Sequence, residues 1–515
     1  MQHWGGGYVT DIEYAPGFYT AQSPARLVLA ATINGVEAPD LSGAFTYCEL
    51  GCGNGGTLLV LAALHPQAEF HGIDFNPAHI AHGASRAKSA RLDNAYLHEL
   101  DVNQLTAPGQ PLLPMFDVIA MHGVWSWIAP DRQEAILRFI SARLKPGGLV
   151  YVGYNAMPGW TTVLPAQRII WELTRQWQAR SDTAARRAVD MLARLAGTSG
   201  FPERLKDGAK RIQDATNRGL PASYIAHEYL NEHWRPLYHA DVARAFAGAK
   251  LGFAASTDLL RNFQNMVLTT EQSDVLAAIE SPDLRETLKD FFADNWFRAD
   301  VYVRGVRKMS AQRRETMLRD LSLALLGSPP NAFHITRSDG SAWRPDPQVY
   351  RPIFEALTRR PHRISELLDL PDLPAGHKVG AVELVGVLVG SELAGVYKDA
   401  SPEELQSAAR FNALIEAEAE TDQPDSSTLA VAALGNGVKL EGLSQKLWFE
   451  LRRGEPQDAP TLAGRFVEWC VARGVHPLVN GEEVKDEQAA RAAVASEYAK
   501  LLQNAVPSWK ALGII

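Results

Sequence analysis

The sequence predicts an α/β fold, in which a parallel sheet covered by helices on both faces is followed by mainly helical domains. Three observations support this prediction. Residues 42–155 alternate between short apolar runs typical of strands and segments with helical patterning. A glycine-rich turn follows the first of these strands. From about residue 160 onward, the apolar residues follow the helical period.

The elements of the first domain follow from this alternation and from the turn residues between the runs. In chain order, strands are expected at 46–50, 69–75, 95–102, 116–122 and 148–154, and helices at 58–64, 77–90 and 132–144. The last of these helices should end at the Lys145-Pro146-Gly147-Gly148 turn, because proline cannot continue a helix and glycine turns the chain.

Breaks in composition divide the rest of the chain. A Gly-Ser-Pro-Pro stretch at 327–330 and an acid-rich segment at 416–425 are typical of boundaries and linkers. These breaks predict a cofactor-binding domain at 1–160, a helical domain at 161–327, a domain of short helices at 328–422 and a mainly helical domain at 428–515.

Composition excludes several classes of protein. The 515 residues are 46% apolar and 21% charged, as in a globular protein, and the formal charge of −8 does not favour a nucleic-acid binder. Apolar runs such as 58–64 are far too short to span a bilayer, so no membrane insertion is expected. Three cysteines make no disulfide framework, and the first eight residues lack the features of a secretory signal. A cytoplasmic location is therefore expected.

The most informative segment is 49–56, which reads Glu-Leu-Gly-Cys-Gly-Asn-Gly-Gly. Its glycines allow a sharp turn from strand to helix and let a ligand approach the backbone closely. Asp74 ends the next strand, 19 residues after Gly55, where its carboxylate can reach ribose hydroxyls. This arrangement suits a cofactor that contains a nucleoside.

A dinucleotide and S-adenosylmethionine are the two candidates for that cofactor, because the same glycines also satisfy G-x-G-x-x-G. Glu49 would repel a pyrophosphate but suits a cationic methionine moiety. Asp101 ends the third strand, where a carboxylate could meet the adenine amine. No set of residues for hydride transfer is evident, so S-adenosylmethionine is favoured.

At these residues the sequence resembles the class I methyltransferases, whose fold is Rossmann-like. Residues 49–55 match their first motif, E-x-G-x-G-x-G, and residues 72–76 match the acidic motif of the second strand. Residues 116–119 and 144–148 match the fourth strand and the turn before the fifth.

A narrower resemblance links the chain to bacterial methyltransferases with a regulatory domain. It rests on the strings at 122–127, 154–160 and 297–305, and on Tyr19 with residues 23–27. This group includes the rickettsial-type protein lysine methyltransferases of outer membrane proteins. The resemblance implies a protein substrate that presents lysine and a homodimer. It also implies that the helical domain at 161–327 is a regulatory or dimerisation domain and that the domain at 328–422 is winged-helix-like.

The motifs and the resemblance together give the expected site. The expected cofactor-binding residues are Tyr14, Tyr19, Glu49, Gly51, Cys52, Gly53, Asn54, Gly55, Asp74, Phe75, Asn76, Asp101, Val102, His122, Gly123, Val124 and Trp127. The expected catalytic residues are Tyr154, Trp125 and Tyr19, because aromatic walls suit a lysine stem and its methylated ammonium products. No metal is expected, because methyl transfer needs none and the histidines lack a ligand spacing.

Two further function classes remain open from the sequence. One is a small-molecule methyltransferase whose helical domains cover the pocket. The other is a cofactor-sensing regulator that binds DNA through residues 345–400, where Arg359, Arg360 and Arg363 form a small basic cluster. The absence of N/D-P-P-Y after the fourth strand lowers the weight of a nucleic-acid amine as the acceptor, and no stable nucleic-acid partner is expected. Arg298, Asp300 and Arg304 could form an interdomain ion-pair cluster or contact the substrate, and the sequence favours the structural role.

Overall fold

The computed structural model describes residues 5–14, 17–105, 113–217, 220–330, 332–419 and 428–515. Its central feature is a seven-stranded sheet with the order β3-β2-β1-β4-β5-β7-β6. The strands are β1 Thr46–Leu50, β2 Glu69–Asp74, β3 Ala95–Glu99, β4 Phe116–His122, β5 Leu144–Asn155, β6 Leu251–Ser256 and β7 Phe297–Arg304. The first five run parallel, and β7 pairs antiparallel with both β5 and β6. This is the Rossmann-like class I methyltransferase fold that the sequence predicts.

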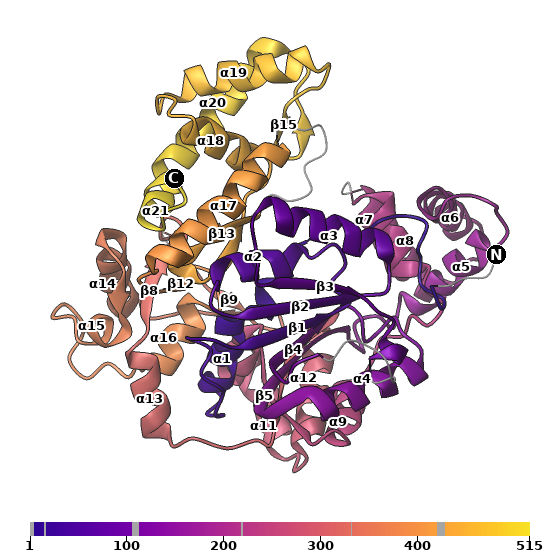
Figure 1. The fold of residues 1–515 in the computed structure, drawn as a ribbon, viewed down its shortest axis with the longest axis horizontal. Helices are drawn as coiled ribbons and strands as arrows, with labels where there is room; N and C mark the ends of the chain where they lie inside the picture. The colour runs from indigo at the N-terminus through magenta and orange to yellow at the C-terminus, as the bar shows by residue number, and fades with distance from the viewer. Residues whose placement is uncertain (1–4, 15–16, 106–112, 218–219, 331, 420–427) are drawn as a thin grey trace.

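Two layers of helices cover the sheet, as Figure 1 shows with α2 and α3 on one side and α4 and α9 on the other. The helices of these layers are α1 Pro24–Ile33, α2 Gly56–Leu64, α3 Pro77–Ser89, α4 Pro130–Arg143 and α9 His239–Ala247. Successive strand residues point to opposite layers, so Tyr47 packs in the core beside α2 while Cys48 packs in the core beside α4. Helix α2 carries no charge because every one of its residues is buried.

The outer strands of the sheet come from a part of the chain that the sequence analysis expects to be helical. Strands β6 and β7 lie within 161–327, so the sheet extends beyond the boundary at 160. That segment does supply many helices around them. They are α5 Leu164–Thr174, α6 Ser181–Ala196, α7 Glu203–Asn217, α8 Ala222–Tyr229, α10 Gln264–Val267, α11 Thr270–Ala277, α12 Pro282–Ala293 and α13 Ala311–Arg319. The segment also contains the 3-10 helix η3 Leu259–Asn262, and the first domain contains η1 Thr20–Gln22 and η2 Val102–Gln104.

The next region contains a small three-stranded sheet and several helices. The sheet has the order β11-β8-β12, formed by His362–Arg363, Ser322–Leu325 and Ala394–Tyr397. The other elements of this region are β9 Ile335–Thr336, β10 Ala342–Trp343, α14 Pro347–Arg359, α15 Ile364–Leu368, α16 Ala381–Leu388 and α17 Pro402–Ala419. Helix α16 is almost wholly inside the molecule: a Cβ on Gly386 would lie 2.3 Å from the Phe263 ring. A DNA-reading role for this helix would therefore require it to leave the core.

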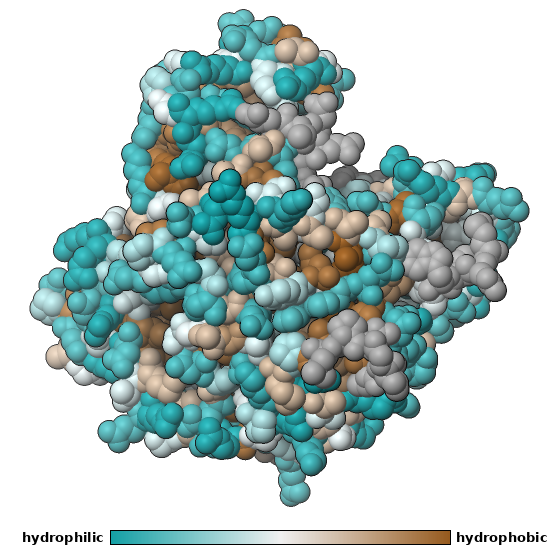
Figure 2. Space-filling model, in the orientation of Figure 1, coloured by the Kyte–Doolittle hydropathy of each residue, from teal (hydrophilic) through white to brown (hydrophobic). Residues whose placement is uncertain are grey.

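The final region forms a lobe whose helices project from the body in Figures 1 and 2, and whose first hairpin packs against α2. Its elements are β13 Thr428–Val431, η4 Ala432–Leu434, β14 Asn436–Lys439, α18 Gly442–Arg452, α19 Ala459–Ala472, β15 Leu478–Val479, β16 Glu482–Glu483, α20 Glu487–Asn504 and α21 Val506–Ala511. A buried ion pair joins the catalytic domain to α17 at the base of this lobe, with Arg86 Nε 2.7 Å from Glu418 Oε1. The face seen in Figure 2 is mainly hydrophilic, with small separated apolar areas.

Within the described residues, no helix combines the length and the apolar character needed to cross a bilayer.

Candidate active site

A cavity of about 520 Å³ lies at the carboxyl ends of the parallel strands. This edge is where ligands bind in open α/β sheets. The N-terminal segment and helix α8 form its other walls, and Figure 1 shows α5–α8 gathered beyond the arrowheads of the strands. The cavity brings together fifteen expected site residues: Tyr14, Tyr19, Glu49, Gly51, Cys52, Gly53, Asn54, Asp74, Phe75, Asp101, Val102, His122, Gly123, Val124 and Trp127.

The glycine loop between β1 and α2 forms the floor of the cavity. Gly51, Gly53 and Gly55 all have positive φ, at 70°, 54° and 79°, which only glycine adopts without strain. A Cβ on Gly51 would lie 2.5 Å from Val124 Cγ2, whereas a Cβ on Gly53 would meet nothing within 4 Å. The loop is thus packed on one side and leaves open space for a ligand on the other.

Asp74 connects this loop to the end of β2. Its Oδ2 accepts a hydrogen bond from Gly53 N at 2.9 Å, and its Oδ1 accepts one from Asn76 N at 2.9 Å. Backbone donors therefore fix the orientation of the buried carboxylate at the edge of the cavity.

Glu49 is a buried acid at the end of β1. Gln22 Nε2 donates to its Oε1 at 3.3 Å, while its Oε2 is buried and accepts no hydrogen bond from the described residues. Burial raises the pKa of this carboxyl group to about 8. A carboxylate oxygen left without a donor is costly, so the cavity offers a place for a cationic ligand group at this end.

Asp101 holds the N-terminal segment against the third strand. Arg132 donates through Nη2 to Asp101 Oδ2 at 3.0 Å and through Nη1 to the backbone oxygen of Gly6 at 3.1 Å. Asp101 also accepts from Asn103 N at 2.9 Å as the cap of η2. Its carboxylate therefore belongs to the cavity wall and to the attachment of the segment that covers it.

Aromatic rings form much of the remaining wall. Tyr19 stacks on His122 with 3.7 Å between ring centroids, and the His122 Nδ1 lies 2.7 Å from the Tyr151 hydroxyl. Burial lowers the pKa of His122 to about 3, so this ring is neutral at physiological pH. Tyr14 packs at a tilt on Trp127, with 6.2 Å between the ring centroids.

Four expected site residues do not line the cavity. Gly55 precedes α2 as its N-cap, and Asn76 caps α3 by accepting a hydrogen bond from Ala78 N at 3.0 Å, so both position the elements that carry the site. Trp125 is buried and packs edge-on against Phe246 on the α4 side of the sheet. The expectation that it lines the acceptor site does not match this position.

Tyr154 is the fourth of these residues, and it lies in a buried polar cluster. Its hydroxyl donates to Asp300 Oδ2 at 2.8 Å, and Asp300 in turn accepts from Arg298 Nε at 2.8 Å. The hydroxyl of Tyr154 therefore lies in this cluster and not in the cavity, where a catalytic residue is expected.

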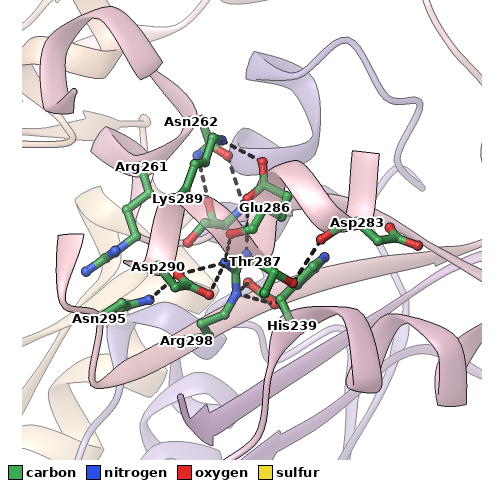
Figure 3. Close-up of polar contacts among 12 residues, drawn as sticks. His239, Arg261, Asn262, Asp283, Glu286, Thr287, Lys289, Asp290, Asn295 and Arg298 are labelled. Atoms are coloured by element: carbon green, nitrogen blue, oxygen red, sulfur yellow. Dashed lines mark hydrogen bonds and ion pairs between the residues drawn. The ribbon is translucent and has the colours of Figure 1, made fainter. Parts of the chain in front are cut away.

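Figure 3 shows the centre of that cluster, where the Arg298 guanidinium lies between Asp290 and Glu286 of α12. Arg298 Nη1 contacts both Asp290 carboxylate oxygens at 3.0 Å, and Nη2 contacts Glu286 Oε2 at 3.2 Å. Burial acts to raise the pKa of Asp300, but the Arg298 guanidinium and the contact with His239 Nδ1, at 3.1 Å, hold it below its usual range. The cluster supports the structural role for Arg298 and Asp300. Arg304 also has a structural contact, since it donates to the Leu144 backbone oxygen.

Several residues that line the cavity are not among the expected site residues. The polar ones include Glu228 on α8, Asn155 at the end of β5 and Arg132 on α4. The aromatic ones are Tyr8, Tyr224, Trp160, Trp296 and Phe297. Only the strings at 154–160 and 297–305 gave a signal for any of these residues, through the resemblance. Among the described residues, no group of three histidine, cysteine or acidic side chains is placed to hold a metal ion.

Comparison with known proteins agrees with this geometry. Residues 48–150 match the family model described as a methyltransferase domain, and residues 221–304 match the predicted methyltransferase regulatory domain. An uncharacterised protein of Synechocystis is 32% identical over 368 residues, which cover 71% of each chain. The chain belongs to the S-adenosylmethionine-dependent methyltransferases with a regulatory domain.

Other relatives of this regulatory-domain methyltransferase come from Rickettsia. An uncharacterised protein of Rickettsia prowazekii is 26% identical over 43% of this chain and 86% of its own. The structure of PKMT2 from Rickettsia typhi in complex with AdoHcy aligns with a TM-score of 0.64 at 18% identity, covering 97% of this chain and 99% of that one. The likeness extends the shared fold over nearly the whole methyltransferase.

The regulatory domain has a direct part in this methyltransferase's architecture. The matched residues 221–304 begin at α8, which lines the cavity through Glu228, and end with β7, which pairs with β5 in the sheet. The domain therefore completes both the catalytic sheet and the wall of the cavity.

Proposed function

We propose that this methyltransferase transfers methyl groups to lysine side chains of a protein, and that both S-adenosylmethionine and the lysine bind in the cavity described above. An outer membrane protein is the acceptor that the sequence resemblance suggests. The fold shared with PKMT2 from Rickettsia typhi, a protein lysine methyltransferase, supports a lysine side chain as the acceptor. A homodimer in the cytoplasm is part of the same proposal.

The observation that carries the proposal is an aromatic cavity with two buried carboxylates that lack a cationic partner. Glu49 and Glu228 each have one oxygen that accepts no hydrogen bond from the described residues. A methyl donor with an amino group and a lysine ammonium group are two cations, one for each carboxylate. Aromatic walls favour both, through cation–π contact and apolar packing on the lysine stem.

The residues of the first three strand ends fit S-adenosylmethionine. Glu49 would bind the amino group of its methionine part, Asp74 would bind the ribose hydroxyls, and Asp101 lies where the adenine is expected. The open space beside Gly53 lets the ligand approach the backbone. When bound, the cofactor would supply a methyl group on a sulfonium, whose carbon an amine nitrogen can attack in line while the thioether sulfur leaves.

The chain's own contribution is alignment, exclusion of water and control of protons. Tyr8, Tyr14 and Tyr19 come from the N-terminal segment that covers the cavity, and they shield it from solvent. Burial raises the pKa of Tyr19, so its hydroxyl is neutral and can hydrogen-bond an amine.

The test is a labelling experiment that shows which class of molecule accepts the methyl group. The purified chain would be incubated with radiolabelled S-adenosylmethionine and, separately, with fractionated cell protein, nucleic acid and metabolites. Label recovered as methylated lysine after acid hydrolysis of the protein fraction would support the proposal. Label confined to the metabolite or nucleic-acid fraction would contradict it.

A further inference from the structure

Helix α8 places one acidic side chain, Glu228, in the wall of the cavity. The residue is only 6% exposed. Its Oε1 accepts hydrogen bonds from Asn155 Nδ2 at 2.8 Å and from Trp234 Nε1 at 3.4 Å. Its Oε2 accepts none from the described residues. Two neutral donors therefore fix the carboxylate by one oxygen and leave the other for a ligand.

The position of Glu228 differs from that of the acids expected to hold the cofactor. Glu49, Asp74 and Asp101 lie at or just beyond the ends of β1, β2 and β3, on one half of the sheet. Asn155, which holds Glu228, is the last residue of β5, on the other side of β4. A donor that extends over the first half leaves the second half for the acceptor.

We propose that Glu228 binds the ammonium group of the acceptor lysine and takes the proton that this group must lose. The inference rests on the proposed function, because it names the residue that receives the lysine in that reaction. A proton moves from the lysine Nζ to Glu228 Oε2, and the freed nitrogen lone pair forms the bond to the methyl carbon. The bond from that carbon to sulfur breaks, its electron pair stays on sulfur, and Glu228 later releases the proton to water.

The tyrosines and the histidine near Glu228 do not change their protonation near neutral pH, whereas Glu228 does. Tyr8, Tyr14, Tyr19 and Tyr224 line the same cavity, and burial raises the pKa of each phenol, that of Tyr224 to about 12. His227, its neighbour on α8, has its pKa lowered to about 4 by burial. All five are therefore uncharged near neutral pH, and no cation of the described residues is paired with Glu228.

Burial also raises the pKa of Glu228 to about 7, while its two hydrogen bonds act in the opposite direction. Below that pH the acid is protonated in the empty cavity and cannot accept the lysine proton. Turnover should therefore rise as the pH increases through about 7. A general base whose pKa lies near the working pH is well matched to this task.

The decisive variant is Glu228→Gln. The glutamine oxygen can still accept from Asn155 and Trp234, while an uncharged amide replaces the free oxygen. With a peptide that contains a single lysine as the probe, we expect turnover to fall about 100-fold or more. The limb of the pH profile near 7 should vanish, and S-adenosylmethionine affinity should stay nearly unchanged. The matched control is Glu232→Gln, at an exposed acid that follows α8, which should behave like the wild type.

A second readout does not depend on turnover. An infrared titration of the empty protein should show two carboxyl groups that lose their protons near pH 7 and pH 8 in the wild type, and only the one near pH 8, that of Glu49, in Glu228→Gln. Glu228→Asp, which keeps an acid, should recover part of the turnover together with its pH limb. Equal turnover in the Asp and Gln variants, or an unchanged pH profile in Glu228→Gln, would overturn the inference. A wild type that binds the donor but puts no label on lysine would instead refute the proposed function.

Discussion

At the scale of single residues, the cavity contains two acids, Glu49 and Glu228, that are not paired with a cation of the described residues. Glu49 is the clearest case, since its Oε2 is buried without a donor. We expect Glu49→Gln to weaken S-adenosylmethionine binding about 10- to 100-fold, because a hydrogen bond to a charged group contributes about 1.5–3 kcal/mol. Isothermal titration calorimetry measures this directly.

The pH dependence of that binding has a defined sign. The pKa of Glu49 is about 8 in the empty cavity, so the acid is protonated below that value and must lose its proton to pair with the donor's amino group. Affinity should therefore rise with pH up to about 8 in the wild type and stay flat in Glu49→Gln. Glu69→Gln, at an exposed position that starts β2, is the control. A pH-independent affinity in the wild type would contradict the assignment.

The same acids predict how the empty protein responds to pH. Glu49 and Glu228 have folded-state pKa values of about 8 and 7, both above the ordinary value of 4.5. The folded state thus binds more protons than the unfolded state between these limits. Stability should be greatest at low pH within this window and should fall as the pH rises from about 5 to 8. The free energy of unfolding can be measured with urea across this pH range. It should depend less on pH in the Glu49→Gln, Glu228→Gln double variant than in the wild type.

Individual side chains also show where sequence reasoning stops. Trp125 and Trp127 are two residues apart in one string, yet Trp127 lines the cavity and Trp125 packs in the core. The backbone after β4 has no regular period, so the sequence cannot say which side chain faces which way. Glu228 lies on an ordinary short helix, and only its tertiary contact with Asn155 distinguishes it from a surface acid.

At the scale of elements, the loop between β1 and α2 requires glycine for two separate reasons. Gly51 has a φ of 70°, and an added Cβ would lie 2.5 Å from Val124 Cγ2. We expect Gly51→Ala to reduce stability by about 1–3 kcal/mol and to weaken cofactor binding, since the loop must shift to relieve the clash. Gly43→Ala, where nothing lies within 4 Å, should change neither. Thermal unfolding and calorimetry on both variants separate the two effects, and a neutral Gly51→Ala would refute the role of the loop.

The elements that the sequence predicts well are those with a local signal. Strands β1, β2 and β4 and the helices between them agree with their expected ranges within a few residues, because alternation and turn residues mark them. Strands β6 and β7 were not expected, since they lie among helices and are stabilised by pairing with β5, which is distant in sequence. Long-range pairing of this kind leaves little trace in local composition.

At the scale of the whole molecule, the C-terminal lobe reaches the cavity through the N-terminal segment. A Cβ on Gly437 in β14 would lie 2.8 Å from Phe18 Cζ, so the hairpin of β13 and β14 packs directly on Phe18. The next residue, Tyr19, stacks on His122 inside the cavity, and its backbone N–H donates to Thr57 Oγ1 at 3.1 Å. The segment is thus held between the lobe and the start of α2.

This arrangement predicts that a change in the lobe alters the active site. Gly437→Val should push the Phe18 ring aside, disturb the stacking of Tyr19 and weaken S-adenosylmethionine binding several-fold, while Gly43→Val should have no effect. If Phe18 carries the coupling, the same valine should weaken binding much less in a Phe18→Ala background, because the clash with Phe18 is then absent and only the one with Thr428 inside the hairpin, 2.7 Å from the added Cβ, remains. Binding measured across this double-mutant cycle decides the matter. An equal loss of affinity in both backgrounds would mean that the lobe acts on the site by another route, or only through overall stability.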